Sequence, residues 1–348
     1  MKYINGFFYN NKTTGMERFA TEITKELDSI CKKNEITIVL PPKTTSKFKF
    51  KNINTLTLLK TPYLQLKNIK LNILLLFTRR ICVNYLNHIP FFGKNIVFLH
   101  DIYYKIFPED CDSQKDIKAR QRALREYKKI TKKAKMICTV SEYSKQQIIS
   151  HYHVNPDKIS VIYNSSEYMK KIVSDTTIFN KYPQLIDKSF YFTLGSLAKR
   201  KNLKWILEHA KLFPKEQFVI SGSSIQKLIP KELEELMKCQ NIILAGYLSD
   251  EQVKAMMEHC KAFIFPSYFE GFGIPPLEAL YCGCPIIIAN SSCLPEIYED
   301  CAHYIDPTDA NINLDELLKE KVANPEKLFQ KYSARNQAEK LYYLIQNI

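Results

Sequence analysis

Residues 261–285, KAFIFPSYFEGFGIPPLEALYCGCP, are the stretch from which the fold of this chain can be predicted. The apolar run 262–265 ends at Pro266 and predicts a short buried strand. A glycine-containing loop follows. Pro275 and Pro276 then suit the first turn of a helix, because the missing N–H of proline costs little there. A strand, a loop and a helix N-terminus in this order can bring backbone amides against an anionic ligand.

Two carboxylates lie in this unit, Glu270 in the loop and Glu278 one turn into the helix, with seven residues between them. On strand, glycine and helix alone, an ordinary β-loop-α connection is the simpler interpretation. The full pattern, Ser267-x-x-Glu270-Gly271-Phe272-Gly273-x-Pro275-x-x-Glu278-Ala279, resembles the nucleotide-sugar signature of glycosyltransferase family 4. The resemblance implies that Glu278 binds the ribose hydroxyls of the donor. It also implies that Glu270 holds the transferred sugar and stabilises positive charge at its anomeric carbon. Gly271, Phe272 and Gly273 lie at the donor by the same likeness.

Three consecutive cations, Lys199, Arg200 and Lys201, follow the predicted strand 190–194 and precede a helix led by Asn202. Cations at a helix entrance oppose the helix dipole, so helix stability does not explain them. Binding of a diphosphate does, because this leaving group needs charge neutralisation as the glycosidic bond breaks.

This stretch resembles the G-x-L-x-x-R-K-N motif of the family, which puts Gly195, Arg200 and Lys201 at the donor phosphates and gives the two cations a part in catalysis. Many members carry Arg directly after the glycine, where this chain has Ser196. The choice among Lys199, Arg200 and Lys201 therefore stays open.

The first half of the chain carries two more features of the same family. The predicted strand 95–101 ends in His100 and Asp101, and polar residues at the carboxyl end of a parallel strand point into the ligand crevice of a doubly wound domain. By resemblance to the family's H-D motif, His100 lies at the sugar as a catalytic residue. Asp101 orients it, binds acceptor or caps a local turn. Gly15 opens a helix that runs through Leu27, where its backbone either approaches a phosphate or only caps the helix.

The remaining loops fit the same pattern. The backbone near Gly246 and Tyr247 edges the nucleobase by resemblance, the segment 218–222 ends in a second phosphate- or base-side loop, and 292–296 matches the family's S-x-L-P-E turn. Seven of the nine glycines fall in such strand-end loops, namely Gly15, Gly195, Gly222, Gly246, Gly271, Gly273 and Gly283. In a glycine-poor chain this favours close backbone approach to a ligand.

The alternation of strands and helices predicts an α/β protein of two Rossmann-like domains facing across a cleft, the GT-B fold that the resemblance implies. A length of 348 residues exceeds one ordinary core. We expect an acceptor-side domain over residues 1–170 and a nucleotide-sugar-binding domain over 186–325. The amphipathic tail, about 326–348, is expected to fold back onto the first domain.

The charge is uneven: residues 1–172 hold 31 Lys+Arg against 14 Asp+Glu, within a net charge of +14. A basic helix is predicted over 115–133, and the run 69–80 is either a core helix or an interfacial one. Because no nucleic-acid-binding motif accompanies the charge, an anionic membrane surface or a lipid-linked acceptor fits better than nucleic acid. The absence of a signal peptide, of a membrane-spanning stretch and of patterned cysteines favours the cytoplasm, or the inner face of the cell membrane.

We therefore expect a retaining glycosyltransferase that moves a hexose from a GDP- or UDP-sugar to a glycan or polyprenyl-diphosphate-linked acceptor in O-antigen or capsule synthesis. No cofactor and no metal are expected, because no metal-binding carboxylate motif is evident. Mannose is preferred by resemblance, while glucose, rhamnose and N-acetylglucosamine stay open. The alternatives are a nucleotide-sugar epimerase or phosphorylase of the same fold, or a non-catalytic protein that binds lipid or nucleic acid with steep salt dependence.

Overall fold

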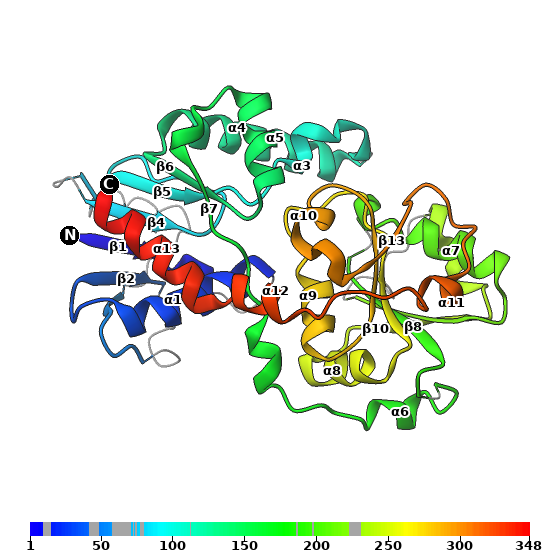
Figure 1. The fold of residues 1–348 in the computed structure, drawn as a ribbon. Helices are drawn as coiled ribbons and strands as arrows, with labels where there is room; N and C mark the ends of the chain where they lie inside the picture. Colours follow the sequence, from blue (N-terminus) through cyan, green and yellow to red (C-terminus); the bar gives the residue numbers. More distant parts are fainter. Residues whose placement is uncertain are drawn as a thin grey trace. The chain divides into compact units, whose positions relative to one another are not determined.

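The computed structural model divides into two compact units, unit 1 (Met1–Ser165 with Tyr332–Ile348) and unit 2 (Ser166–Lys331), coloured along the chain in Figure 1. It describes residues 1–9, 15–41, 49–57, 71, 73, 75–76, 80–111, 113–185, 187–196, 198–222 and 231–348, without the side chains of 231–233. Within this described part, the helices fall short of the length and apolarity needed to cross a membrane.

Unit 1 is built on one sheet of seven parallel strands in the order β3-β2-β1-β4-β5-β6-β7. The strands are β1 (Lys2–Asn5), β2 (Ile36–Leu40), β3 (Asn54–Thr57), β4 (Ile81–Asn84), β5 (Lys94–Phe98), β6 (Met136–Thr139) and β7 (Ile159–Val161). Its helices are α1 (Gly15–Ile30), α3 (Tyr103–Ile106), α4 (Gln114–Lys133), α5 (Glu142–Tyr152) and α13 (Ala334–Asn347), with single 3-10 turns η1 (Gly6–Phe8), η2 (Pro108–Asp110) and η3 (Pro156–Lys158).

The C-terminal tail consists of two helices. The first, α12 (Glu326–Lys331), belongs to unit 2, while α13 begins after Ser333, whose hydroxyl caps it by accepting the Asn336 N–H at 3.2 Å. Helix α13 lies beside α1 in unit 1 (Figure 1), where both bury their apolar faces in one core cluster. Burying that face, rather than helix propensity, holds the tail in place.

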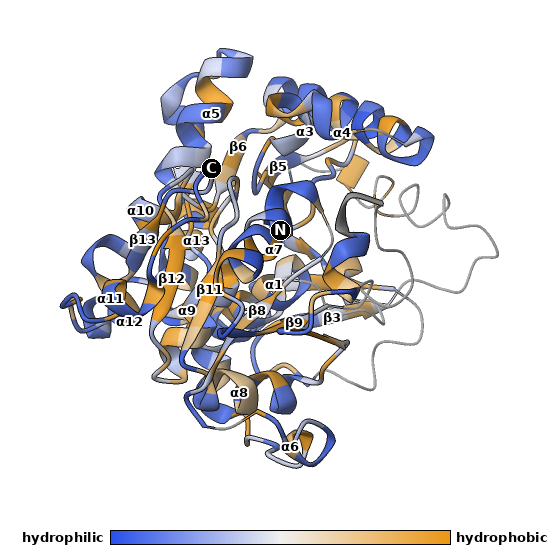
Figure 2. Ribbon diagram, turned by 90° about the vertical axis from the view of Figure 1, so that its right-hand side faces the viewer, coloured by the Kyte–Doolittle hydropathy of each residue, from blue (hydrophilic) through white to orange (hydrophobic). Residues whose placement is uncertain are grey.

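Unit 2 is built on six parallel strands in the order β10-β9-β8-β11-β12-β13. They are β8 (Phe190–Leu194), β9 (Gln217–Ser221), β10 (Ile242–Gly246), β11 (Ala262–Phe265), β12 (Ile286–Ala289) and β13 (His303–Ile305). Between them run η4 (Glu167–Lys171), α6 (Ile178–Lys181), η5 (Lys199–Lys201), α7 (Leu203–Leu212), η6 (Lys231–Met237), α8 (Asp250–His259), α9 (Ile274–Tyr281), α10 (Leu294–Tyr298), η7 (Glu299–Cys301) and α11 (Leu314–Leu317). Strands β11 and β12 are apolar throughout, as Figure 2 shows in orange, because helices cover both faces of a parallel sheet.

Strand β1 ends at Asn5, because the Asn5 side chain accepts the Phe7 N–H at 3.2 Å and starts a 3-10 turn. Asn202 directly precedes α7, as expected. It adopts a left-handed φ of 54°, and its amide donates to Pro266 O at 3.1 Å and to Pro307 O at 2.8 Å. The loop expected after 218–222 and most of the run 69–80 lie outside the described residues.

Two glycines in left-handed conformations, Gly273 before α9 and Gly283 after it, allow a matched prediction. A Cβ on Gly273 (φ +83°) would lie 2.7 Å from Cδ2 of the fully buried Leu294, whereas a Cβ on Gly283 (φ +68°) would meet nothing within 4 Å. We expect Gly283→Ala to lower the free energy of unfolding by about 1–2 kcal/mol through backbone strain alone. Gly273→Ala should lower it by about 2–4 kcal/mol, because overpacking adds to the strain. Urea unfolding of both variants measures the difference, and equal losses would contradict the packing argument.

Candidate active site

The carboxyl edge of the unit 2 sheet has its switch point between β8 and β11, where the strand order reverses direction. In open α/β sheets, ligands bind at this edge beside such a switch point. Strand β8 leads into η5, which carries the three consecutive cations, and β11 leads into the loop that carries Glu270. Because β8 and β11 are paired neighbours, two motifs 69 residues apart in the chain meet here.

Glu270 is the centre of the contacts at this edge. Its Oε1 accepts a hydrogen bond from Lys201 Nζ at 2.7 Å and pairs with Arg200 Nη1 at 2.6 Å. Ser267 Oγ donates to the same oxygen at 2.6 Å, and the Glu270 N–H donates to Ser292 Oγ at 3.0 Å. The residue is only 7% exposed. One buried carboxylate therefore holds both of the cations that the sequence assigns to the donor phosphates.

These contacts keep Glu270 ionised. Burial would raise the pKa of its carboxyl group, but the positive charges of Arg200 and Lys201 outweigh burial. Together with hydrogen bonds from Lys201 and Ser267 they lower the pKa to about 2. The carboxylate is therefore negative throughout the physiological pH range, as stabilisation of a developing positive charge requires.

Lys201 is held along its whole length. Three of its side-chain carbons lie 3.5–3.6 Å from the Cβ position of Gly195, so the stem crosses the bare backbone of that glycine. Its Nζ lies 4.6 Å from the ring centroid of Phe265, a cation–π contact. Among the three cations that the sequence left open, Lys201 and Arg200 reach the carboxylate, while the side chain of Lys199 is exposed.

Hydrogen bonds to backbone carbonyls tie the two loops together and fix this geometry. The Tyr268 N–H donates to Arg200 O at 3.0 Å, and Arg200 Nη1 donates to Phe269 O at 3.2 Å. Ser292 sits in a left-handed conformation with φ 52°, which orients its hydroxyl toward the loop. Ser267 and Ser292 both lie in motifs quoted above, but the motifs alone do not predict that they hold Glu270.

Glu278 lies on α9 and is 6% exposed. The hydroxyl of Tyr168, from η4, donates a hydrogen bond to its Oε1. Nothing in the sequence points to Tyr168, which lies at the end of the first predicted domain, residues 1–170. The carboxylate is nevertheless placed on the first turns of the helix as expected, and its role at the ribose stays a prediction.

The other predicted donor residues are placed as follows. Gly271 and Phe272 are buried beside Glu270, and the Tyr298 hydroxyl donates to the Gly273 carbonyl, which fixes the start of α9. Gly246 has a left-handed φ of 72°, and its carbonyl accepts from the Gly222 N–H and the Ser221 hydroxyl, each at 2.9 Å. The neighbouring Tyr247 is 76% exposed. Their roles at the nucleobase and phosphates stay predictions.

His100 lies just beyond the carboxyl end of β5 in unit 1 and is 7% exposed. Its Nε2 lies 2.9 Å from Tyr85 O, and because a carbonyl only accepts, Nε2 carries the proton. Burial lowers the pKa of His100, although the Tyr85 contact and the charge of Asp101 act to raise it. The imidazole is therefore neutral near pH 7, with an unprotonated Nδ1 that can accept a hydrogen bond from a hydroxyl.

Two further residues of unit 1 carried more than one interpretation. The Asp101 carboxylate accepts the Tyr103 N–H at 2.9 Å, so the local turn cap is present. A role in acceptor binding stays a prediction. Gly15 is the exposed first residue of α1, and the loop before it, residues 10–14, lies outside the described part of the chain. Its approach to a phosphate likewise stays a prediction.

Comparison with models of known protein families identifies the family to which this chain belongs. The family model described as Glycosyl transferases group 1 matches residues 174–338, and the model described as Glycosyltransferase Family 4 matches residues 13–165. The chain belongs to glycosyltransferase family 4, group 1. The two matches follow one another along the chain and divide it near the boundary between units 1 and 2.

Curated relatives of this family 4 chain include O-antigen chain mannosyltransferase B of Escherichia coli, which is 30% identical over 192 residues (51% of this chain, 49% of the relative). The serotype-specific mannosyltransferase WbdA of Escherichia coli is 28% identical over 179 residues (47% of this chain, 22% of the relative). O-antigen chain mannosyltransferase RfbU of Salmonella typhimurium is 26% identical over 229 residues (64% and 59%). The matched region thus spans between about a fifth and three fifths of these relatives.

Solved structures confirm the expected fold. HepE of Anabaena in complex with UDP-glucose superposes with a TM-score of 0.71 at 14% identity, covering 100% of this chain and 99% of that one. WaaG, a glycosyltransferase involved in lipopolysaccharide biosynthesis, gives 0.63 at 15% identity, covering 100% and 98%. This family 4 chain therefore has the GT-B fold, with two parallel-sheet α/β domains.

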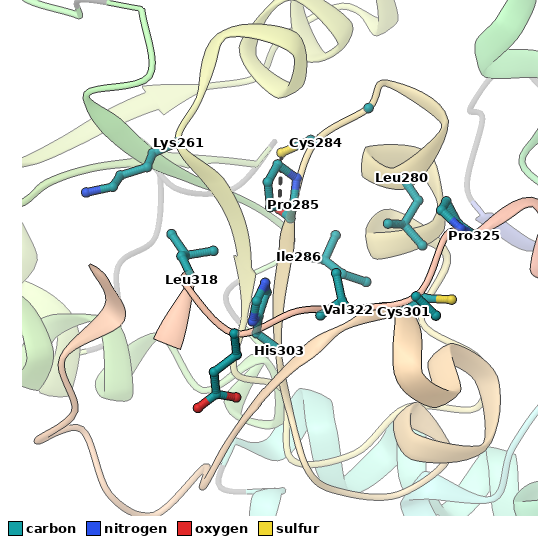
Figure 3. A pocket seen from close by; sticks show the side chains of 13 residues that line it. Lys261, Leu280, Cys284, Pro285, Ile286, Cys301, His303, Leu318, Val322 and Pro325 are labelled. Carbon is teal, nitrogen blue, oxygen red and sulfur yellow. Dashed lines mark hydrogen bonds between the residues drawn. The ribbon is translucent and has the colours of Figure 1, made fainter. Parts of the chain in front are cut away.

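A pocket of about 420 Å³ lies at the opposite edge of the unit 2 sheet, at the amino ends of β11, β12 and β13 (Figure 3). Most of its lining side chains are apolar, and Lys261, His303 and Glu320 are the polar residues that line it. Since the family 4 motifs lie at the carboxyl ends of these strands, the pocket is not part of the candidate active site. Among the described residues, no three His, Cys, Asp or Glu side chains are grouped so as to hold a metal ion.

Proposed function

We propose that this chain is a retaining hexosyltransferase that moves a hexose from a nucleoside-diphosphate sugar to a hydroxyl of a growing bacterial surface polysaccharide. The observation that carries the proposal is the buried, ionised Glu270 paired with Arg200 and Lys201 at the switch point of the unit 2 sheet. A single carboxylate between two cations suits a substrate that presents a diphosphate and a developing positive charge side by side.

In the proposed reaction, the bond between the anomeric carbon and the diphosphate oxygen breaks while the acceptor oxygen approaches from the same face. Arg200 and Lys201 neutralise the departing diphosphate, and its oxygen takes the proton of the incoming hydroxyl. Glu270 stabilises the positive charge on the anomeric carbon, and Glu278 binds the ribose hydroxyls. His100 accepts a hydrogen bond from the sugar through Nδ1. We propose that these residues act without a metal ion or another cofactor.

The relatives support a finer proposal about the substrates. Three of them are named as mannosyltransferases, two of these for the O-antigen chain, so we propose mannose as the sugar. Glucose, rhamnose and N-acetylglucosamine are the alternatives. Because solved neighbours were crystallised with UDP or UDP-glucose, both GDP- and UDP-sugars stay in the proposal. The acceptor would be a glycan on a polyprenyl diphosphate, which places the enzyme at the cytoplasmic face of the cell membrane.

A thermal-shift screen with UDP, GDP, dTDP and ADP tests donor binding. One nucleoside diphosphate at about 100 times its Kd should add about 2.7 kcal/mol of stability, which raises Tm by several degrees. The matching nucleoside monophosphate is the control, and it should shift Tm less because it lacks the second phosphate. Transfer from the matching nucleotide sugar should retain the anomeric configuration and continue in EDTA. The absence of a shift with every diphosphate would refute donor binding. An inverted product would refute the retaining mechanism, and loss of activity in EDTA would refute metal independence.

A further inference from the structure

Tyr168 contacts Glu278 from a segment outside the family 4 motifs. It lies on η4, directly after the boundary between the two units, and its hydroxyl donates to Glu278 Oε1. Glu278 is 6% exposed, and Tyr168 is half-buried. A donor to a buried carboxylate stabilises its charge, and it also fixes the direction in which the carboxylate points.

The segment that carries Tyr168 is anchored on unit 2. Lys254 Nζ, from α8, donates to the carbonyl of Met169 at 3.0 Å and to that of Ile172 at 2.9 Å. The side chain of Met169 is only 2% exposed. Because the next residue in the chain is buried and its carbonyl is bonded, the backbone of Tyr168 has a fixed place from which the hydroxyl meets Glu278.

The helix that carries Glu278 has further contacts with the same segment. Tyr281, at the end of α9, stacks on Phe329 of α12, with ring centroids 4.0 Å apart and an interplanar angle of 14°. Lys170 of η4 places its Nζ 5.2 Å from the Tyr281 centroid and 5.8 Å from the Phe329 centroid. Helix α9 and η4 are therefore packed together by contacts beyond the hydrogen bond from Tyr168.

We propose that Tyr168 is a positioning residue for Glu278, and that this pair makes the chain select ribonucleoside over 2′-deoxyribonucleoside diphosphates. The inference rests on the role proposed above for Glu278 at the ribose. An ionised carboxylate accepts about four hydrogen bonds, so Glu278 can hold the tyrosine hydroxyl and two ribose hydroxyls at once. A glutamate that is fixed in advance loses little side-chain freedom when the ribose binds, which strengthens binding.

The fixed position of the carboxylate is the source of the selection. A mobile glutamate can turn toward water when the ligand lacks a hydroxyl. A glutamate held by Tyr168 stays in its buried place and is left with an unmade hydrogen bond, so the site rejects the analogue without the hydroxyl. Donors built on deoxyribose, such as dTDP-sugars, should therefore be poor substrates.

Binding of matched nucleotides tests the selection. Calorimetry gives the ratio of the Kd of 2′-deoxy-UDP to that of UDP, or the same ratio for the guanosine nucleotides if GDP binds more tightly. The natural chain should give a ratio of at least about 10, the effect of one hydrogen bond to a charged group. Tyr168→Phe, which keeps the ring, should lower this ratio at least about threefold, and Glu278→Ala should bring it to about 1.

The matched control is Tyr304→Phe. It removes another hydroxyl of unit 2, which donates to Glu299 O at 2.6 Å, and it should leave the ratio unchanged. Kinetics give a second readout: in Tyr168→Phe the KM for the nucleotide sugar should rise while kcat stays nearly the same, because the ribose contact is equal in the ground and transition states. Thermal melting without ligand measures any loss of stability separately.

The outcomes separate the inference from the proposed function. A ratio that falls in Glu278→Ala but not in Tyr168→Phe would make the tyrosine a purely structural residue and overturn the inference. Equal binding of both nucleotides by the natural chain would overturn it as well. An unchanged ratio in Glu278→Ala would instead refute the proposed ribose contact of Glu278, and the selection with it.

Discussion

Glu270→Gln lowers kcat for glycosyl transfer by at least about 100-fold in our expectation, because an amide of the same shape cannot stabilise positive charge at the anomeric carbon. Affinity for the nucleoside diphosphate should stay within about threefold, since the variant keeps both Arg200 and Lys201. Steady-state kinetics and calorimetry measure the two effects separately. Normal turnover by the variant would remove Glu270 from the reaction.

The Glu270→Gln variant should also be less stable than the natural chain, and the pH dependence of this difference tests the reason. Loss of the buried negative charge leaves two cations close together, at a cost of about 1–3 kcal/mol. The pKa of Glu270 falls from 4.5 to about 2 on folding, so its stabilisation is fully present above pH 4.5 and is lost as pH falls toward 2. Urea unfolding should therefore give a constant difference between the natural chain and the variant at pH 6 and above, and a smaller one near pH 3. A difference that grows on acidification would contradict the ion-pair account.

Lys201→Ala should raise the Kd for the recognised nucleoside diphosphate about 10- to 150-fold, because a charge-assisted hydrogen bond to phosphate contributes about 1.5–3 kcal/mol. The loss should be much smaller for the nucleoside monophosphate. The matched control is Lys204→Ala on α7, whose side chain is 71% exposed and pairs only weakly with Glu208 at 3.4 Å. Unchanged affinity in Lys201→Ala would move the phosphate contact to Arg200 or Lys199, and single variants at those positions would identify it.

Elements with strong local signals could be predicted from the sequence. The strand, loop and helix of 261–285 appear as β11, the Glu270 loop and α9, with both prolines in the first turn of the helix. The basic helix α4 also appears where the pattern predicts it. Short strands such as β3 and β4 were missed, because four residues carry too little periodicity to distinguish a strand from a loop.

The site was harder to predict because its contacts depend on tertiary structure. Glu270 and Lys201 were each singled out, but assigned to different parts of the donor. Only the pairing of β8 with β11 shows that they form one ion-paired unit. The hydrogen bond from Tyr168 to Glu278 spans 110 residues and lies in no motif. The side-chain amide of Asn202 bridges the carbonyls of Pro266 and Pro307, and contacts of this range have no signature in the local sequence.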